Sequence, residues 1–109
     1  MKVAFLEDIP QQLHDPKDIL PKGRGAEENY IKYSVELGEH TKNQSWVNSI
    51  LRRQNASVMN FDDVLCVNNR CPLVSNSRFI YFDDDHLSIE GSKLVYPKLK
   101  DELRKFLEN

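Results

Sequence analysis

Short apolar runs alternate with amphipathic segments along this chain. Residues 3–6 form a continuous apolar run that ends at Glu7 and Asp8, which is typical of a strand covered on both faces in a parallel sheet. Residues 56–61 alternate apolar and polar positions, as a strand does, and also end at acidic positions. Both runs predict strands of an α/β fold.

Three segments show the three- and four-residue spacing of amphipathic helices. The first starts at Glu27 and can end at Gly38, and the second carries an apolar stripe on which we expect Trp46 to be a core residue. The last starts at Ser88, a good N-cap residue, and contains Pro97, where we expect a kink or a restart. Its apolar stripe comprises Leu94, Val95, Leu99, Leu103 and Phe106.

The remaining segments predict a loop and a hairpin. Residues 9–26 contain three prolines and two glycines, which favours a long loop. Residues 71–74 and 78–82 flank the turn-rich sequence Ser-Asn-Ser at 75–77, which predicts a small hairpin before the last helix.

The composition is typical of a folded domain and not of a nucleic-acid-binding one. A chain of 109 residues has room for one domain, and its 39% hydrophobic residues are clustered. The net charge of −2, with both signs interspersed, leaves no electrostatic footprint for nucleic acid. No apolar run approaches the roughly 20 residues of a membrane span, and the start is too quickly acidic for a signal peptide. We expect a single domain over residues 1–109, without an export signal.

The two cysteines, Cys66 and Cys71, allow three interpretations. A disulfide would close a small loop and needs an oxidising compartment, whereas two free thiols fit the spacing equally well. A zinc site is less favoured, because it needs four ligands and only one histidine lies nearby. The residues alone leave the first two interpretations open.

Candidate chemistry lies where an aromatic run meets three aspartates and a histidine. Residues 79–82 are followed by Asp83, Asp84, Asp85 and His86. The carboxyl end of a strand is where α/β folds place their sites, and Asp83 can bond the His86 ring across a tight turn. Such a carboxylate would fix the tautomer of the ring and stabilise its imidazolium. A plain solvated turn is the alternative. A Ca²⁺ or Mg²⁺ site is less favoured, because three consecutive carboxylates cannot all face one ion.

The pattern Asp83-x-x-His86-Leu87-Ser88-x-x-Gly91 resembles the last sequence block of the SGNH (GDSL-type) hydrolases. The resemblance is closest to the SGNH domain at the C-terminus of acyltransferase-three membrane O-acetyltransferases, and it covers nearly the whole chain. Further matching features are Asp63-Val64-Leu65-Cys66, Cys71, the aromatic run before the aspartates, and Pro97.

The resemblance implies a partial SGNH-like three-layer α/β/α fold. Its features would be a short, mostly parallel sheet, flanking helices and a small hairpin before the last helix. The implied activity is that of an esterase or O-acyltransferase, in which a serine acyl-enzyme moves an acetyl group to or from a cell-surface polysaccharide hydroxyl. His86 would be the general base and Asp83 would orient it, while Asp84, Asp85 and Ser88 would shape the turn. No cofactor and no metal are implied.

The family's nucleophilic serine lies in an upstream Gly-Asp-Ser block, and this sequence contains no Gly-Asp-Ser. We therefore expect a C-terminal portion of an SGNH domain that is inactive alone. Its expected partners are the upstream half of that domain or the membrane acyltransferase domain, and a polysaccharide acceptor. The family's extracytoplasmic location, in the periplasm or at the cell surface, favours a disulfide between Cys66 and Cys71.

Two further expectations concern the surface. A truncated parallel sheet leaves an open edge, so that a homodimer could form through residues 3–6. The alternative to an enzyme is a non-catalytic remnant that binds a glycan or a protein. That alternative predicts that Asp83 and His86 are too far apart to bond, and that residues 3–6 present an exposed apolar face.

Overall fold

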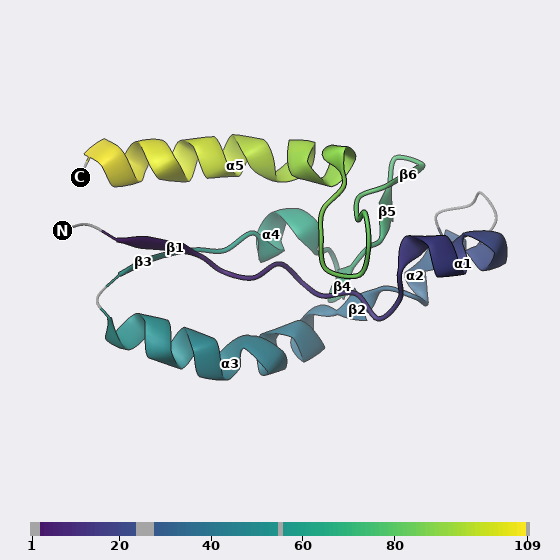
Figure 1. Ribbon diagram of the computed structural model, residues 1–109, viewed down its shortest axis with the longest axis horizontal. Helices are drawn as coiled ribbons and strands as arrows, with labels where there is room; N and C mark the ends of the chain where they lie inside the picture. The colour runs from purple at the N-terminus through teal and green to yellow at the C-terminus, as the bar shows by residue number, and fades with distance from the viewer. Residues whose placement is uncertain (1–2, 24–27, 55, 109) are drawn as a thin grey trace.

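The computed structural model describes residues 3–23, 28–54 and 56–108, and it arranges five helices and six short strands along this part of the chain (Figure 1). The strands are β1 Ala4–Leu6, β2 Val35–Glu36, β3 Ser57–Met59, β4 Arg70–Cys71, β5 Val74–Ser75 and β6 Arg78–Phe79. The helices are α1 Pro16–Gly23, α2 Glu28–Ile31, α3 Leu37–Arg53, α4 Asp62–Leu65 and α5 Ile89–Glu108. None of the described helices is both long and apolar enough to cross a membrane.

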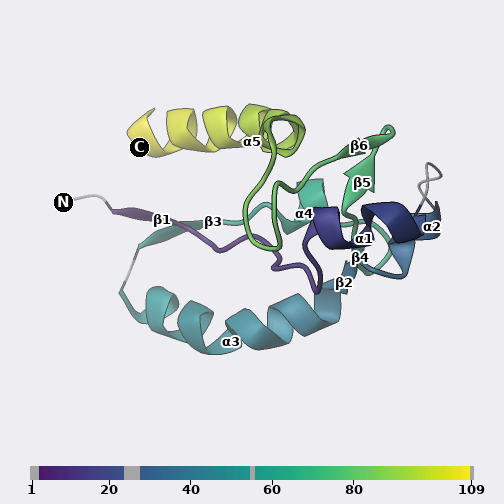
Figure 2. The ribbon, with the colours of Figure 1, turned by 45° about the vertical axis from the view of Figure 1, so that its right-hand side comes forward.

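Strands β1 and β3 pair in parallel, as the two apolar runs predict. Phe5 lies opposite Val58, and the pairing continues beyond the strand where the Glu7 N–H donates to the Met59 carbonyl at 2.8 Å. The pair lies between α3 and α5 in both views (Figures 1 and 2). The other described pairs, β2–β4 and β5–β6, are antiparallel. The mostly parallel sheet that we predicted is therefore reduced to one pair in the described chain.

The expectation that residues 3–6 are covered on both faces is wrong. Phe5 is 37% exposed and Leu6 is 58% exposed. The physical reason is the width of the sheet, because β1 has β3 as its only strand partner among the described residues. The radius of gyration is 15.1 Å, against about 13 Å for a compact chain of this length, so little of the molecule lies deep inside.

The predicted loop over residues 9–26 is interrupted by helix α1, which corrects that prediction. The Asp15 carboxylate accepts the N–H of Lys17 at 3.0 Å, as an N-cap does. Pro16 occupies the first helical position, where its missing N–H costs nothing. Residues 24–26 of the predicted loop lie outside the described residues.

Gly38 lies in the first turn of α3, although the sequence pattern suggested that a helix would end there. The first predicted helix is short, because α2 is followed by strand β2. A distant residue determines where α3 begins. The Asn69 carbonyl accepts the Leu37 N–H at 3.0 Å, and its side-chain oxygen accepts the Gly38 N–H at 3.3 Å. These bonds satisfy N–H groups that a helix start leaves without partners.

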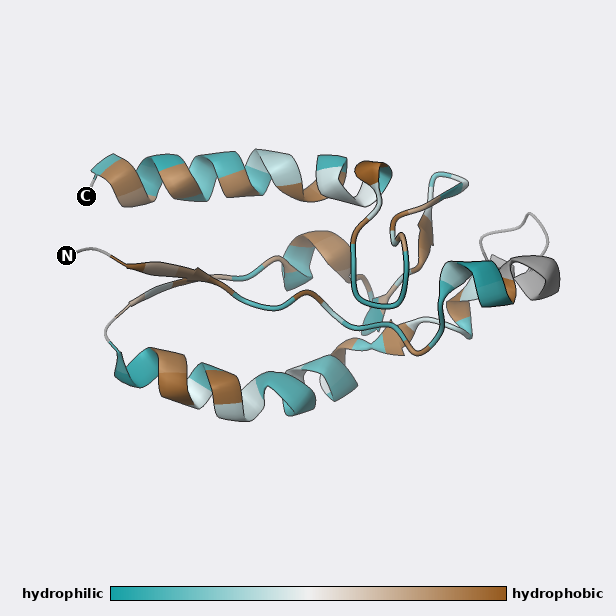
Figure 3. Ribbon diagram, in the orientation of Figure 1, coloured by the Kyte–Doolittle hydropathy of each residue, from teal (hydrophilic) through white to brown (hydrophobic). Residues whose placement is uncertain are grey.

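Trp46 is 67% exposed, so the expectation that it belongs to the core is wrong. Ile50 on the same helix is 46% exposed, and Leu103 on α5 is 40% exposed. Figure 3 shows apolar positions along β1 and in bands along α3 and α5. The core is instead built around the antiparallel strands and the short helices. Its fully buried side chains include Ile19, Leu65, Cys71, Leu73, Ile80 and Tyr81.

The predicted hairpin and the predicted cap of the last helix are both present. Strands β5 and β6 are joined by Asn76 and Ser77, whose φ angles of 51° and 62° are those of a two-residue hairpin turn. The Ser88 hydroxyl oxygen accepts the Gly91 N–H at 3.1 Å and its O–H donates to the Phe79 carbonyl at 2.7 Å. Helix α5 runs through Pro97 without ending.

Gly91 is required because α5 starts directly against the main chain. A Cβ atom at Gly91 would collide with the Ile80 carbonyl oxygen. This close approach also brings the Ser88 N–H to the same carbonyl, at 3.0 Å. The turn between Ile80 and Ser88 is thereby closed at its base.

Gln12 links three segments through its buried side-chain amide and its main-chain N–H. Its side-chain NH₂ donates to the Cys71 carbonyl at 2.7 Å, and its side-chain oxygen accepts the Val35 N–H at 2.9 Å. Its own N–H donates to the Asp84 carbonyl at 2.7 Å. Gln12 is 3% exposed, so neither water nor another side chain can replace these bonds easily.

We predict that Gly91→Ala destabilises the protein by about 1–3 kcal/mol, because the added carbon must displace α5 from the main chain. Urea denaturation followed by circular dichroism measures the change. Gly38→Ala is the matched control. A Cβ at Gly38 meets only the Asn69 side-chain oxygen, at 3.9 Å, so we expect a neutral or slightly stabilising effect. Equal losses in the two variants would contradict the close-approach argument.

We predict that Gln12→Leu destabilises the protein by about 2 kcal/mol or more, because it leaves the Cys71 carbonyl and the Val35 N–H buried without partners. Gln11→Leu is the control, since Gln11 is exposed and its amide makes one long contact of 3.4 Å to Asp84. Thermal unfolding of both variants measures the difference. The prediction fails if the Gln12 variant is as stable as the Gln11 variant.

Candidate functional site

The three aspartates and the histidine form a tight turn between the hairpin and α5. The Phe82 N–H donates to the His86 carbonyl at 2.7 Å, and Tyr81 pairs with Leu87 across the turn. Because the turn is closed on both sides, Asp83 and His86 are held on the same short segment. The alternative of a non-catalytic remnant predicted the opposite arrangement of this pair.

The Asp83 carboxylate contacts both the ring and the main-chain N–H of His86. The His86 Nδ1 atom lies 3.0 Å from each carboxylate oxygen of Asp83. Asp83 Oδ1 also accepts the main-chain N–H of His86 at 2.7 Å and that of Asp85 at 3.0 Å. The main-chain bonds of the turn thus fix the carboxylate independently of its contact with the ring. The ring nitrogen that the carboxylate contacts is Nδ1. These contacts engage Nδ1 and not the other ring nitrogen, Nε2.

Asp85 also contacts the ring, which the sequence did not indicate. Its Oδ1 atom lies 2.8 Å from His86 Nδ1. Ligating atoms of Asp83, Asp85 and His86 lie within 4.8 Å of one another, so the three could also contact a cation. Both carboxylates already lie at the same ring nitrogen, and the His86 side chain is 71% exposed. The arrangement is therefore a carboxylate–imidazole pair at the surface, with a second carboxylate beside it.

The contacts shift three pKa values. The Asp85 N–H, followed by the ring and the N–H of His86, lowers the pKa of Asp83 from 3.8 to about 2. The hydrogen bond that the His86 ring donates to Asp83 raises the pKa of His86 above 6.5, and the charges of Asp83 and Asp85 act in the same direction. The proximity of Asp83 raises the pKa of Asp85. Asp83 therefore remains a carboxylate throughout the range in which His86 titrates.

These shifts also give the sign of the pH dependence. The pairing of His86 contributes stability that is fully present below pH 6.5 and is lost as the pH rises through the folded-state pKa. The bonds to Asp83 contribute stability that is present above pH 3.8 and is lost as the pH falls toward about 2. Both groups are exposed to solvent, so salt weakens the ring–carboxylate attraction.

A buried tyrosine anchors the turn. The Tyr81 hydroxyl donates to the Pro10 carbonyl at 2.6 Å, and the side chain is 1% exposed. Burial raises the pKa of Tyr81 to about 12, so that the hydroxyl stays protonated and keeps donating. Together with the main-chain bond from Gln12 to Asp84, this contact ties the turn to residues 10–12.

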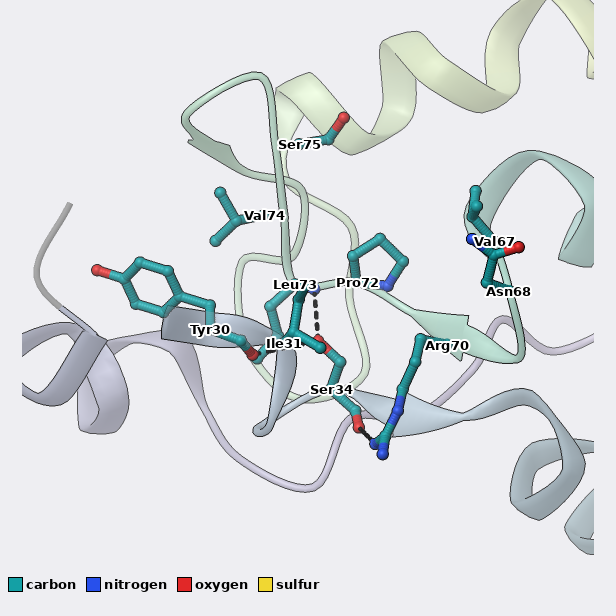
Figure 4. Close-up of a pocket in the computed structure, with 10 residues that line it drawn as sticks. All are labelled: Tyr30, Ile31, Ser34, Val67, Asn68, Arg70, Pro72, Leu73, Val74 and Ser75. Atoms are coloured by element: carbon teal, nitrogen blue, oxygen red, sulfur yellow. Dashed lines mark hydrogen bonds between the residues drawn. The ribbon is translucent and has the colours of Figure 1, made fainter. Parts of the chain in front are cut away.

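Two serines, Ser34 and Ser88, use their hydroxyl groups in hydrogen bonds to the main chain. Ser88 caps α5, and Ser34 is 1% exposed. Figure 4 shows Ser34 beside a cavity of about 450 Å³ between α2 and the strands β4 and β5. There its hydroxyl oxygen accepts the Leu73 N–H and its O–H donates to the Tyr30 carbonyl, each at 3.3 Å. Neither of these two serines is bonded to the His86 ring.

Cys66 and Cys71 form a disulfide. It closes the loop that contains Asn69, the residue that binds the start of α3. The Cys71 carbonyl accepts the Gln12 amide, so the disulfide loop is connected to the Asp83–His86 turn through Gln12.

We predict that the pKa of His86, measured by NMR titration of the ring protons, lies above 6.5 and falls toward 6.5 in Asp83→Asn. The physical reason is the loss of a charged acceptor at Nδ1. Asp84→Asn is the control, since it removes an equal charge one position away while Asp84 makes no contact with the ring among the described residues. An equal fall in the two variants would mean that general negative charge, and not the Asp83 contact, raises the pKa.

Comparison with known proteins adds one finding. The family model described as the SGNH domain fused to AT3 domains matches residues 1–101. No curated protein and no solved structure matches the chain. The matched segment includes the disulfide loop, the hairpin and the whole turn that holds Asp83 and His86. This chain, an α/β structure with small sheets and flanking helices, belongs to the family of SGNH domains that are fused to AT3 domains.

Proposed function

We propose that this chain supplies the acid–base half of a serine esterase or O-acyltransferase site. The observation that carries the proposal is the contact between the Asp83 carboxylate and His86 Nδ1, on a turn braced from both sides. In this role Asp83 orients the ring, and Nε2 of His86 exchanges protons with the reacting groups. Membership in the SGNH family supports this reaction class.

The proposed reaction passes through an acyl-serine. A serine hydroxyl loses its proton to His86 Nε2 as its oxygen bonds to the acetyl carbonyl carbon. The bond to the leaving alcohol then breaks, and His86 returns the proton to that alcohol. In the second half, a sugar hydroxyl or water loses a proton to His86 and attacks the acyl-serine, and the serine regains its proton. The proposed acceptor or substrate is a cell-surface polysaccharide hydroxyl.

The nucleophile in this proposal comes from another segment, in cis or on a partner chain. This sequence has no Gly-Asp-Ser, and the buried Ser34 and the helix-capping Ser88 bond to main-chain groups and not to the His86 ring. The exposed apolar side chains of β1 support an additional neighbouring segment in this proposal. The outer edge of β1, which pairs with no strand among the described residues, supports it too. An upstream strand that pairs there would widen β1–β3 toward the three-layer α/β/α fold. A second copy of the chain is the other occupant that this edge would accept.

An extracytoplasmic location belongs to the same proposal. A disulfide between Cys66 and Cys71 persists in an oxidising compartment and is rare in the cytosol. A free-thiol titration of protein isolated under acid quench would test it. Two reactive thiols per chain in the native host would argue against this location.

We predict that the 109-residue chain alone does not turn over an acetylated sugar such as glucose pentaacetate. An unactivated ester is required, because an exposed imidazole cleaves activated phenyl esters without an enzyme site. With the Gly-Asp-Ser segment of an SGNH domain joined or added, acetate release is expected. It should fall by about 10³-fold or more in His86→Ala, since the triad acts as a unit.

His14→Ala is the matched control, because His14 contacts Tyr33 and lies outside the turn. Robust turnover by the chain alone that His86→Ala abolishes would contradict the separate nucleophile. Turnover of the assembled domain that survives His86→Ala would contradict the catalytic role of His86. The alternative of a non-catalytic binding module, which the exposed face of β1 favours, predicts no turnover in any combination.

A further inference from the structure

A second group of polar side chains lies at the carboxyl end of the parallel pair. Glu7 follows β1, and Asp62 follows β3 at the start of α4, so the parallel pairing brings both carboxylates to one edge. His40, from the first turns of α3, completes the group. Ligating atoms of the three residues lie within 4.8 Å of one another.

The His40 ring is buried with one nitrogen unsatisfied. The side chain is 3% exposed, and Nε2 lies 3.3 Å from Asp62 Oδ1. The two atoms are not aligned for a hydrogen bond, and Nε2 has no other hydrogen-bond partner in the described part of the chain. A buried polar atom without a partner is uncommon and costly in a folded protein, and an absent ion is one recognised explanation.

The carboxylates are oriented but not neutralised. Amide groups of Asn48 and Asn60 donate to the two oxygens of Glu7, each at 2.8 Å. The Asn60 amide also donates to Asp62 at 3.2 Å. Among the described residues, no lysine or arginine forms an ion pair with Glu7 or Asp62. Two partly buried carboxylates are therefore fixed in place beside an imidazole nitrogen that makes no aligned hydrogen bond.

We propose that Glu7, His40 and Asp62 bind one divalent transition-metal ion, with Zn²⁺ as the preferred ion. One imidazole nitrogen and two carboxylate oxygens are a donor set that Zn²⁺ accepts, whereas Ca²⁺ and Mg²⁺ prefer oxygen donors alone. Bonds of about 2.0–2.2 Å place tetrahedral ligands about 3.4 Å apart, which side-chain movements of roughly 1 Å can achieve here. The asparagine amides then hold the Glu7 carboxylate in orientation, as outer-shell partners of metal ligands do.

The site has room for a fourth ligand. A hollow of about 520 Å³ is lined by Glu7, Asn48, Asn60 and Asp62, and also by Arg52. Water or a small anion in this hollow would complete the coordination. The bound ion would connect the end of β1, the start of α3 and the start of α4. The expectation that the chain binds no metal did not include this group, because Glu7, His40 and Asp62 are far apart in the sequence.

Calorimetric titration of the disulfide-bonded chain with Zn²⁺ tests the site, and Co²⁺ absorption reports the coordination. Thiols cannot contribute, because both cysteines are in the disulfide. We expect one ion per chain, a rise in Tm of about 5 °C at saturation, and at least 100-fold weaker binding in His40→Ala. Because His40→Ala removes a buried ring, Glu7→Gln and Asp62→Asn, which keep side-chain shape, are measured as well. Each should weaken binding at least tenfold in a chain whose circular dichroism is unchanged.

His86→Ala is the matched control, since it disrupts the other cluster able to contact a cation. It should leave the affinity unchanged. The proposal is overturned if the wild-type chain shows no saturable binding up to 1 mM Zn²⁺. It is equally overturned if binding is lost in His86→Ala while Glu7→Gln and Asp62→Asn bind normally. These results do not depend on esterase activity, so they are separate from the test of the proposed function.

Discussion

The arrangement of this molecule depends on one buried side-chain amide. Gln12 satisfies the Val35 N–H and the Cys71 carbonyl at once, and its main chain holds Asp84. A hydrocarbon side chain of similar size could fill this space but could not satisfy a buried donor and a buried acceptor at once. The strand pair β2–β4, the disulfide loop and the turn with Asp83 and His86 are therefore parts of one hydrogen-bonded unit.

Local sequence patterns predicted the elements whose determinants lie within a few positions. The Ser88 cap, the turn at residues 75–77 and the parallel strands are of this kind. The start of α3 could not be predicted in the same way, because the groups that cap it belong to Asn69, 31 residues from Gly38. Helix α1 was missed although Asp15 and Pro16 carried a local signal for a helix start. The number of prolines and glycines obscured that signal.

The two polar clusters also differ in whether local sequence or distant residues determine them. Asp83 and His86 are three positions apart, so a tight turn brings them together whatever the remainder of the chain does. Glu7, His40 and Asp62 come from three elements, and only the parallel register of β1 and β3 and the docking of α3 make them neighbours. No spacing rule connects these three positions, and Asn48 and Asn60, which orient Glu7, are no more visible in the sequence.

The stabilising contacts and the exposed apolar surface occupy different parts of the molecule. The disulfide, the Gln12 bonds and the fully buried side chains surround the antiparallel strands, whereas Phe5, Leu6 and Trp46 leave apolar surface at β1 and along α3. Burial of that surface by a further segment would add hydrophobic stabilisation without replacing the bonds that fix the turn, because these bonds go to Pro10 and Gln12. A site divided between two segments requires this property. In the proposed divided site, a rigid half that holds the base would favour catalysis, since positional precision contributes much of the rate.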